Sequence, residues 1–139
     1  MPVGILGAWE RGYVAPKTEA DLWKFPLRDF GVDFWSMVPV SGIEESDLVE
    51  FRDMKTALEI YREKFAIVFL DEKARDELAD FRHPESAVYV FGRVGYNPAA
   101  ELARPNDYGV RIATPAGAGL LWPHQCAALV LYHRSTQWP

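Results

Sequence analysis

Short apolar runs recur along the chain at the length of buried strands. The runs Val3–Gly7, Ala66–Leu70 and Ala87–Phe91 are almost entirely apolar. Such continuous runs are typical of strands in a parallel sheet that is covered on both faces. Two further segments, Val32–Val40 and Tyr108–Ile112, are rich in β-branched and aromatic residues and predict two more strands.

Helical patterns separate these strands. The expected helices are one that Thr18 caps and that runs towards Asp29, one over Met54–Lys64, a short charged one over Glu72–Asp80, and a last one over Pro123–Tyr132. Alternation of strands and helices predicts an α/β fold, with residues 1–139 as a single domain. We expect a mostly parallel sheet of five or six strands with helices on both faces.

Three loops are the natural place for a ligand. In parallel α/β sheets, ligands bind beyond the carboxyl ends of the strands. That rule directs attention to Ala8–Lys17, Gly92–Pro98 and Thr114–Pro123. The last two contain glycines, which let main-chain N–H and C=O groups approach a ligand closely. Such a cleft can read an adenine ring through the backbone, although two ordinary turns would show the same pattern.

Composition and charge narrow the class of protein. The net charge is −5, which argues against coating nucleic acid by bulk charge and leaves RNA binding to a local basic patch. Cys126 is the only cysteine, so an internal disulfide and a multi-cysteine zinc site are excluded, and a reducing, cytoplasmic location is expected. No apolar run approaches the length of a membrane span, and the first residues do not resemble a signal peptide.

Common catalytic and nucleotide-binding motifs are missing. No strand is followed by a Gly-x-Gly-x-x-Gly or Walker pattern, and the histidines and acids show no metal-ligand spacing, so we expect no metal. His83 and His133 are expected at the surface. His124 opens the last helix beside a glycine loop, which makes it a candidate ligand contact. Cys126 is expected to pack as a small buried group.

Five short pieces of the chain form a pattern that is known from other proteins. They are Phe91-Gly92, Ile112 to Gly117, Ala127-Ala128 and Leu131-Tyr132 in the C-terminal half, with Phe30-Gly31-Val32-Asp33 upstream. In these pieces the chain resembles the SPOUT superfamily of trefoil-knotted methyltransferases, and within it the SpoU-like tRNA and rRNA branch. The resemblance implies a C-terminal trefoil knot, an S-adenosylmethionine pocket, a homodimer and an RNA substrate.

The same resemblance implies the site residues. The expected cofactor-binding residues are Phe91, Gly92, Gly95, Ile112, Thr114, Gly117, Gly119, Leu121 and Trp122. Glu10, Arg11, Lys17, Lys24, Arg28 and Arg93 are the charged residues expected near the cleft. Of these, Arg28 and Arg11 are the candidates for the catalytic arginine of the family, which helps the acceptor lose its proton. Lys24 and Arg28 should share one helix face.

Several family positions differ here. Thr18 and Phe25 stand where the family has Asn and Arg, Val94 stands at its glycine-loop Glu, and Leu121-Trp122-Pro123 replaces its Ser-Leu-Asn. The sequence therefore leaves three functions open. The first is an S-adenosylmethionine-dependent methyltransferase acting on RNA. The second is a non-catalytic knotted binding module that keeps the dimer and the cleft. The third is a small nucleotide-processing α/β enzyme that works through its acids.

Overall fold

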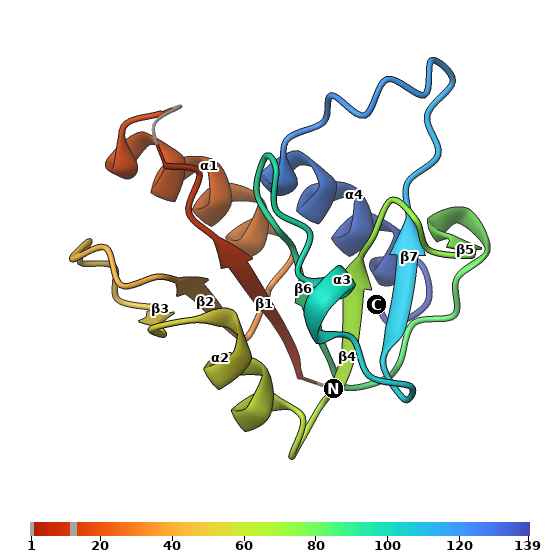
Figure 1. Ribbon diagram of the computed structural model, residues 1–139, viewed down its shortest axis with the longest axis horizontal. Helices are drawn as coiled ribbons and strands as arrows, with labels where there is room; N and C mark the ends of the chain where they lie inside the picture. The colour runs from red at the N-terminus through yellow and green to blue at the C-terminus, as the bar shows by residue number, and fades with distance from the viewer. Residues whose placement is uncertain (1, 12–13) are drawn as a thin grey trace.

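Seven strands form one sheet in the order β3-β2-β1-β6-β4-β7-β5, and every neighbouring pair is parallel. The structure is a computed structural model and describes residues 2–11 and 14–139 (Figure 1). The strands are β1 (Val3–Ala8), β2 (Phe34–Val38), β3 (Leu48–Glu50), β4 (Ala66–Leu70), β5 (Asp76–Glu77), β6 (Ala87–Val90) and β7 (Tyr108–Arg111).

The predicted fold class is confirmed and the strand count is corrected. All five predicted strands are present, and the three continuous apolar runs lie in strands of the covered sheet, as their pattern predicts. The expected five or six strands become seven, since β3 and β5 add three and two residues at the two edges. Segments this short carry too little pattern to predict a strand. The sheet is parallel throughout rather than mostly parallel.

Helices cover both faces of the sheet, as expected. On one face lie α1 (Pro16–Asp29) and α4 (Pro123–Ser135), which contact each other, and on the other lie α2 (Met54–Tyr61) and the one-turn α3 (Ala99–Leu102) (Figure 1). Two apolar cores result. One contains Trp23, Phe91 and Val130, and the other contains Leu58, Phe69 and Val90.

Two local predictions are wrong. The helix expected over Glu72–Asp80 is instead a turn, β5 and the 3-10 helix η1 (Leu78–Asp80). Arg111 explains the difference, because its guanidinium donates to the carbonyls of Ala74 and Arg75 and to Glu77, which holds this segment against β7. Thr18 does not cap α1. The helix begins at Pro16, a residue suited to a first turn, with Ala15 at the cap position.

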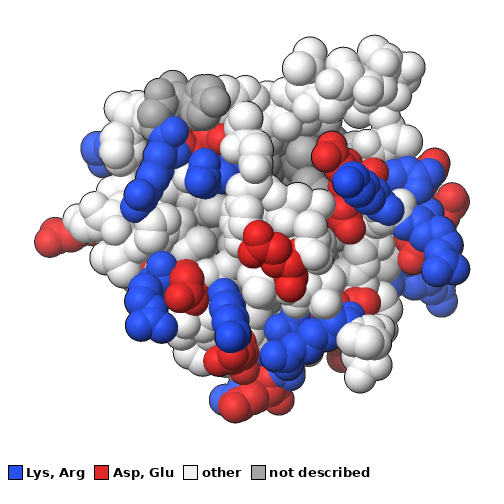
Figure 2. All heavy atoms as spheres, viewed as in Figure 1, with Lys and Arg blue, Asp and Glu red and all other residues white. Residues whose placement is uncertain are grey.

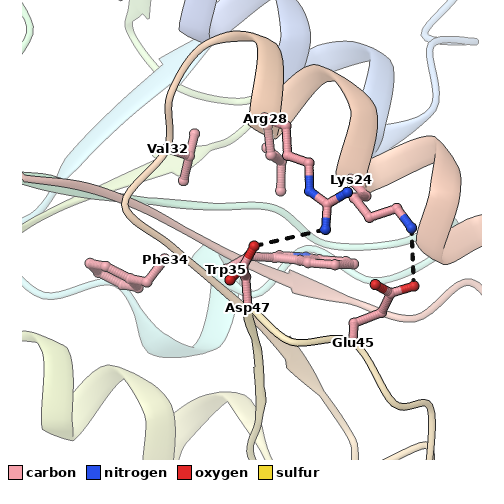
Figure 3. A pocket seen from close by; sticks show the side chains of 8 residues that line it. Lys24, Arg28, Val32, Phe34, Trp35, Glu45 and Asp47 are labelled. Carbon is pink, nitrogen blue, oxygen red and sulfur yellow. Dashed lines mark hydrogen bonds and ion pairs between the residues drawn. The ribbon is translucent and has the colours of Figure 1, made fainter.

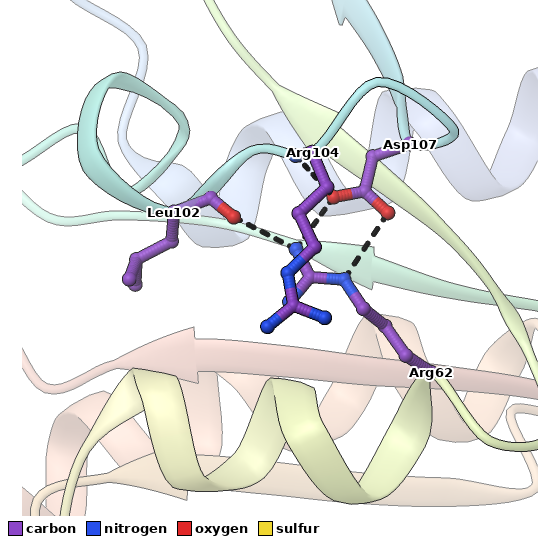
Figure 4. Close-up of polar contacts among 4 residues, drawn as sticks. All are labelled: Arg62, Leu102, Arg104 and Asp107. Atoms are coloured by element: carbon purple, nitrogen blue, oxygen red, sulfur yellow. Dashed lines mark hydrogen bonds and ion pairs between the residues drawn. The ribbon is translucent and has the colours of Figure 1, made fainter.

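One largely buried ion pair lies at the amino ends of the strands, where it connects the end of α2 to the start of β7. Arg62, just after α2, donates to the carboxylate of Asp107, with Nη2 2.5 Å from Oδ2, and to the carbonyl of Leu102 at 2.8 Å (Figure 4). The main-chain N–H of Arg104 donates to the same carboxylate at 2.8 Å. These contacts fix the turn that leads into β7 and so help to set the position of the loop that follows it.

Candidate functional site at the carboxyl edge of the sheet

The three candidate loops leave the same edge of the sheet. They follow β1, β6 and β7, which run parallel, so their carboxyl ends point the same way (Figure 1). The segment after β7 passes over this edge and enters α4. Residues 92–98 and 114–123 therefore lie on one side of the molecule, which is the arrangement that a shared cleft requires.

Trp23 contacts residues at the ends of two of these segments. Its ring, on α1, is 1% exposed and meets the rings of Phe91 and His124 edge to face, at centroid distances of 5.9 and 6.1 Å. The ring of Trp122 stacks on that of His124 with a centroid distance of 5.9 Å. The end of β6 and the start of α4 thus share one aromatic support. Burial lowers the pKa of His124, which favours the neutral form of this imidazole.

A chain of hydrogen bonds links α1 to the glycine loop after β6. Glu19 accepts from the Glu10 main-chain N–H at 2.8 and 3.0 Å and from Trp23 Nε1 at 3.1 Å. The Glu10 carboxylate in turn accepts from the Val94 N–H at 2.7 Å. Val94 stands at the position where the family that the sequence resembles has a glutamate. In this chain the carboxylate at that loop is that of Glu10, which comes from the loop after β1.

Glycines shape the two late loops. A Cβ at Gly92 would collide with the carbonyl oxygen of Tyr96, so only glycine fits this tight turn. Gly117 and Gly119 have φ of 64° and 66°, a region that side chains rarely adopt. Nothing lies within 4 Å of a Cβ built on either of them, so the backbone borders open space.

The predicted cofactor-binding residues range from buried to fully exposed. Phe91 is buried, Gly92, Ile112 and Trp122 are half-buried, and the stretch 113–121, with Thr114, Gly117, Gly119 and Leu121, is exposed. Within the described chain, the main-chain N–H of Gly117 bonds back to Thr114, which leaves a turn at the solvent side. Glu10 Oε2 is a buried acceptor with no hydrogen-bond partner among residues 2–11 and 14–139. Together with the neighbouring loops and their exposed backbone, it fits a nucleoside cofactor with a charged tail.

The predicted catalytic arginines are placed apart. Arg11 is exposed on the loop after β1, directly beside Glu10. Arg28 lies at the far end of α1 and pairs with Asp47 at 3.8 Å (Figure 3). Lys24 and Arg28 line the same small cavity of about 30 Å³, which confirms that they share a helix face. Lys24 is already paired with Asp21 and Glu45, at 3.1 and 3.2 Å.

Two predictions about single residues have different outcomes. Cys126 is buried as expected, and burial raises the pKa of its thiol to about 11, so it packs as an inert group. His83 was expected at the surface and is buried instead. Its Nδ1 lies 2.7 Å from the Tyr89 hydroxyl and its Nε2 lies 2.7 Å from Nδ1 of the half-buried His133. Single histidines in a polar stretch give no signal for such a pairing.

Glu19 and Trp23 are functional candidates that sequence reasoning missed. Both residues fall inside the helix predicted to run from Thr18 towards Asp29, and neither was singled out there. Their spacing of four residues places both on one helix face, where the Trp23 N–H reaches the Glu19 carboxylate. That spacing was the available signal.

Along residues 2–11 and 14–139, no helix has the length and apolar character to cross a membrane. The same residues contain no group of three metal-type side chains. A second cavity, about 560 Å³, lies at the β5–β7 edge and is lined by both basic and acidic side chains.

Basic and acidic side chains are interspersed on the face shown in Figure 2. No continuous basic surface covers that face. Of the four cations expected to form a local patch, Arg11 and Lys17 are exposed, whereas Lys24 and Arg28 are in ion pairs.

Known structures share this fold over the whole chain. A candidate RNA methyltransferase from Bacillus anthracis matches with a TM-score of 0.72 and 14% identity, covering 99% of this chain and 96% of that one. A protein solved in work on 2-OH methylation of C/U34 on tRNA matches with a TM-score of 0.76 and 14% identity, covering 99% and 92%. No family model and no curated protein matches the sequence.

The SpoU methyltransferase AviRb from Streptomyces viridochromogenes also matches, with a TM-score of 0.78 and 13% identity over 98% of this chain and 59% of that one. AviRb has been solved in complex with AdoMet as well. The chain therefore has the fold of the SpoU RNA methyltransferases, as the sequence resemblance predicted.

Proposed function

We propose that the chain is an S-adenosylmethionine-dependent methyltransferase of SPOUT type that acts on RNA. The observation that carries the proposal is the convergence of the loops after β1, β6 and β7 at one edge of a SpoU-like sheet. β6 is the central strand, β1 is its neighbour and β7 lies one strand in from the edge, so each loop leaves a strand that is paired on both sides and the cleft rests on a rigid base.

The proposed cofactor-binding site is lined by residues 91–95 and 112–122. Exposed main-chain groups at Gly95, Gly117 and Gly119 would bind the nucleoside, and the Trp23 support would hold Phe91 and His124 beneath it. When bound, S-adenosylmethionine supplies a methyl group that its sulfonium already activates. The remaining task of the protein is to align the acceptor, and alignment alone provides a large part of the acceleration.

Arg11 is the better placed of the two predicted catalytic arginines. It is exposed and adjoins Glu10 at the cleft, whereas Arg28 is paired with Asp47 near the other end of α1. Arg11, Lys17 and Arg93 are exposed cations around the loops and are the proposed contacts for RNA phosphates.

A homodimer and a C-terminal trefoil knot belong to the same proposal. The solvent side of α1 exposes Leu22 and Phe25, and the adjoining α4 exposes Leu129 and Tyr132. Four apolar side chains on adjacent helices form a face that a second copy would cover. The likeness to SpoU structures across the whole chain supports the knot. The single buried thiol fits the expected cytoplasmic location.

A non-catalytic binding module is the second candidate, and one observation favours it. Phe25, which stands where the resemblance places the family's arginine, is 62% exposed and has no polar group that could act on an acceptor. The third candidate, a nucleotide-processing enzyme, would use acids at the strand ends such as Glu10. The shared fold with RNA methyltransferases makes it the weakest of the three.

Two assays test the proposal. Calorimetric titration with S-adenosylhomocysteine should show binding, and incubation with methyl-labelled S-adenosylmethionine and bulk RNA should transfer label to the RNA. Arg11→Ala should lower transfer without weakening cofactor binding. Binding without transfer to any RNA would favour the non-catalytic module, and the absence of binding would refute the methyltransferase.

A further inference from the structure

Two acidic side chains are buried side by side beneath the candidate cleft. Glu10 is 2% exposed and Glu19 is 3% exposed. Carboxylates are rarely buried this completely unless a cation or several hydrogen bonds compensate them. Within residues 2–11 and 14–139, neither carboxylate forms an ion pair.

The hydrogen bonds of the two groups are unequal. Both oxygens of Glu19 accept hydrogen bonds, from the Glu10 N–H and from Trp23 Nε1. Glu10 Oε1 accepts one, from the Val94 N–H. Glu10 Oε2 is buried and accepts none from the described chain. A buried acceptor without a partner is costly, so a stable protein keeps one mainly where a ligand or a function uses it.

The position of Glu10 connects this charge to the cleft. Its carboxylate contacts the loop after β6, in which Gly92 and Gly95 are predicted to bind the cofactor. Burial of Glu19, reinforced by the neighbouring charge of Glu10, raises the pKa of Glu19, as expected where negative charge accumulates without a counterion.

We propose that Glu10, supported by Glu19, is a specificity-determining residue that favours the cationic cofactor over its uncharged product. The inference rests on the proposed function. S-adenosylmethionine carries a positive sulfonium, and after methyl transfer the same atom is a neutral thioether. The two molecules otherwise share their groups, so a fixed negative charge acts almost entirely on the difference between them.

The expected size of the preference follows from Coulomb's law. One unit charge acting over about 10 Å, at an effective dielectric constant of about 20, changes relative affinity roughly tenfold. Such a preference would also promote release of the product once the sulfonium charge is gone.

The test compares two ligands that do not turn over. Sinefungin carries an ammonium group where the cofactor carries its sulfonium, and S-adenosylhomocysteine carries the neutral thioether. The affinities of both are measured by calorimetry at pH 8 for the wild type and for Glu10→Gln. This substitution keeps an oxygen that accepts from the Val94 N–H, removes the charge and places an amide nitrogen where the second carboxylate oxygen was. We expect it to weaken sinefungin about tenfold more than S-adenosylhomocysteine.

Three controls separate charge from structure. Glu10→Asp keeps the charge and should keep the preference even if both ligands bind more weakly. Glu59→Gln removes an exposed carboxylate from α2, on the opposite face of the sheet, and should change neither affinity. If Glu10→Gln does not fold, as judged by its thermal transition, Glu19→Gln removes the neighbouring charge and should reduce the preference in the same direction.

The outcomes are distinct. An equal loss of affinity for both ligands, or no loss for either, would overturn the charge role of Glu10 while leaving the proposed function intact. Failure of the wild type to bind either ligand would overturn both.

Discussion

Gly92 shows how a single residue shapes the candidate cleft. The chain turns so sharply after β6 that a methyl group on Gly92 would overlap the Tyr96 carbonyl. Overpacking of this kind forces the backbone to shift and costs about 1–3 kcal/mol. Gly92→Ala should therefore weaken binding of S-adenosylhomocysteine by about tenfold and lower the unfolding midpoint, as measured by calorimetry and by thermal melts.

Gly109 provides the matched control. A Cβ at Gly109, inside β7, would lie 3.4 Å from the Cβ of Ala74, which is a tolerable contact. Gly109→Ala should keep both the binding and the melting temperature. Equal behaviour of the two variants would mean that the turn at Gly92 does not shape the site.

His83 makes stability depend on pH. Burial, together with the nearby charges of His133 and Arg134, lowers the pKa of His83 to about 4 from its usual 6.5. Between these two pKa values the unfolded chain therefore binds a proton more readily than the folded one. The contribution of His83 to the free energy of unfolding is fully present above pH 6.5 and is lost as the pH falls towards 4. Urea unfolding at about pH 5 should show about 1–2 kcal/mol less stability from this group than at about pH 7.5.

The variant His83→Phe isolates that contribution. It loses the hydrogen bonds to Tyr89 and His133 and should be less stable at every pH. Its stability should nevertheless change less between the two pH values than that of the wild type. An unchanged pH dependence would assign the effect to other groups.

Sequence reasoning reached some of these residues and not others. Phe91 and Gly92 could be predicted because an apolar run ending in glycine marks the end of a buried strand. Glu10 was among the charged candidates, but its burial could not be foreseen, since an acid after a strand usually faces solvent. Glu19 and Trp23 are only four residues apart, so their spacing was a local signal, although neither residue alone indicates it. The His83–His133 pair depends on a contact between segments far apart in the chain, which local patterns do not encode.

At the scale of elements, the Arg62–Asp107 pair connects α2 to the start of β7. The two side chains are 15% and 7% exposed, and Arg62 also satisfies the Leu102 carbonyl. Removal of one partner would leave the other charge buried and unpaired. Arg62→Ala should lower the free energy of unfolding by about 3 kcal/mol in urea titrations.

The exposed pair Arg52–Asp53 is the comparison. These side chains are 84% and 49% exposed, so water already solvates both charges. Arg52→Ala should leave the urea midpoint where it is. A comparable loss in both variants would show that burial does not govern these pairs.

Elements with a strong pattern of their own were predictable, and elements that depend on partners were not. The strand over Ala66–Leu70 has the bounds that the sequence predicted, because a run of five apolar residues with β-branched and aromatic members has the length and composition of a buried strand. The segment 72–80 has helix-forming composition, yet Arg111 from β7 holds it extended and turned. A tertiary contact outweighed local propensity there.

For the whole molecule, the apolar face of α1 and α4 predicts self-association. Phe25 and Tyr132 are 62% and 63% exposed on helices that contact each other. The double variant Phe25→Lys, Tyr132→Lys should shift the protein from dimer to monomer, because charges at an interface core are strongly disfavoured. Sedimentation equilibrium measures the change.

Ile60→Lys is the control for that experiment. Ile60 is 51% exposed on α2, which covers the other face of the sheet, so the substitution should leave the dimer intact. A wild-type protein that sediments as a monomer, or a dimer that Ile60→Lys dissociates, would contradict the proposed interface.

The central claim is that two loops after parallel strands together bind a nucleoside cofactor through their backbone. The most direct measurement is a titration of the isotopically labelled protein with S-adenosylhomocysteine, followed through its amide NMR signals. We predict shifts that concentrate in residues 92–98 and 114–123, with α2 unaffected. Saturable binding whose shifts lie instead around the β5–β7 cavity, or an absence of shifts at any ligand concentration, would contradict the account.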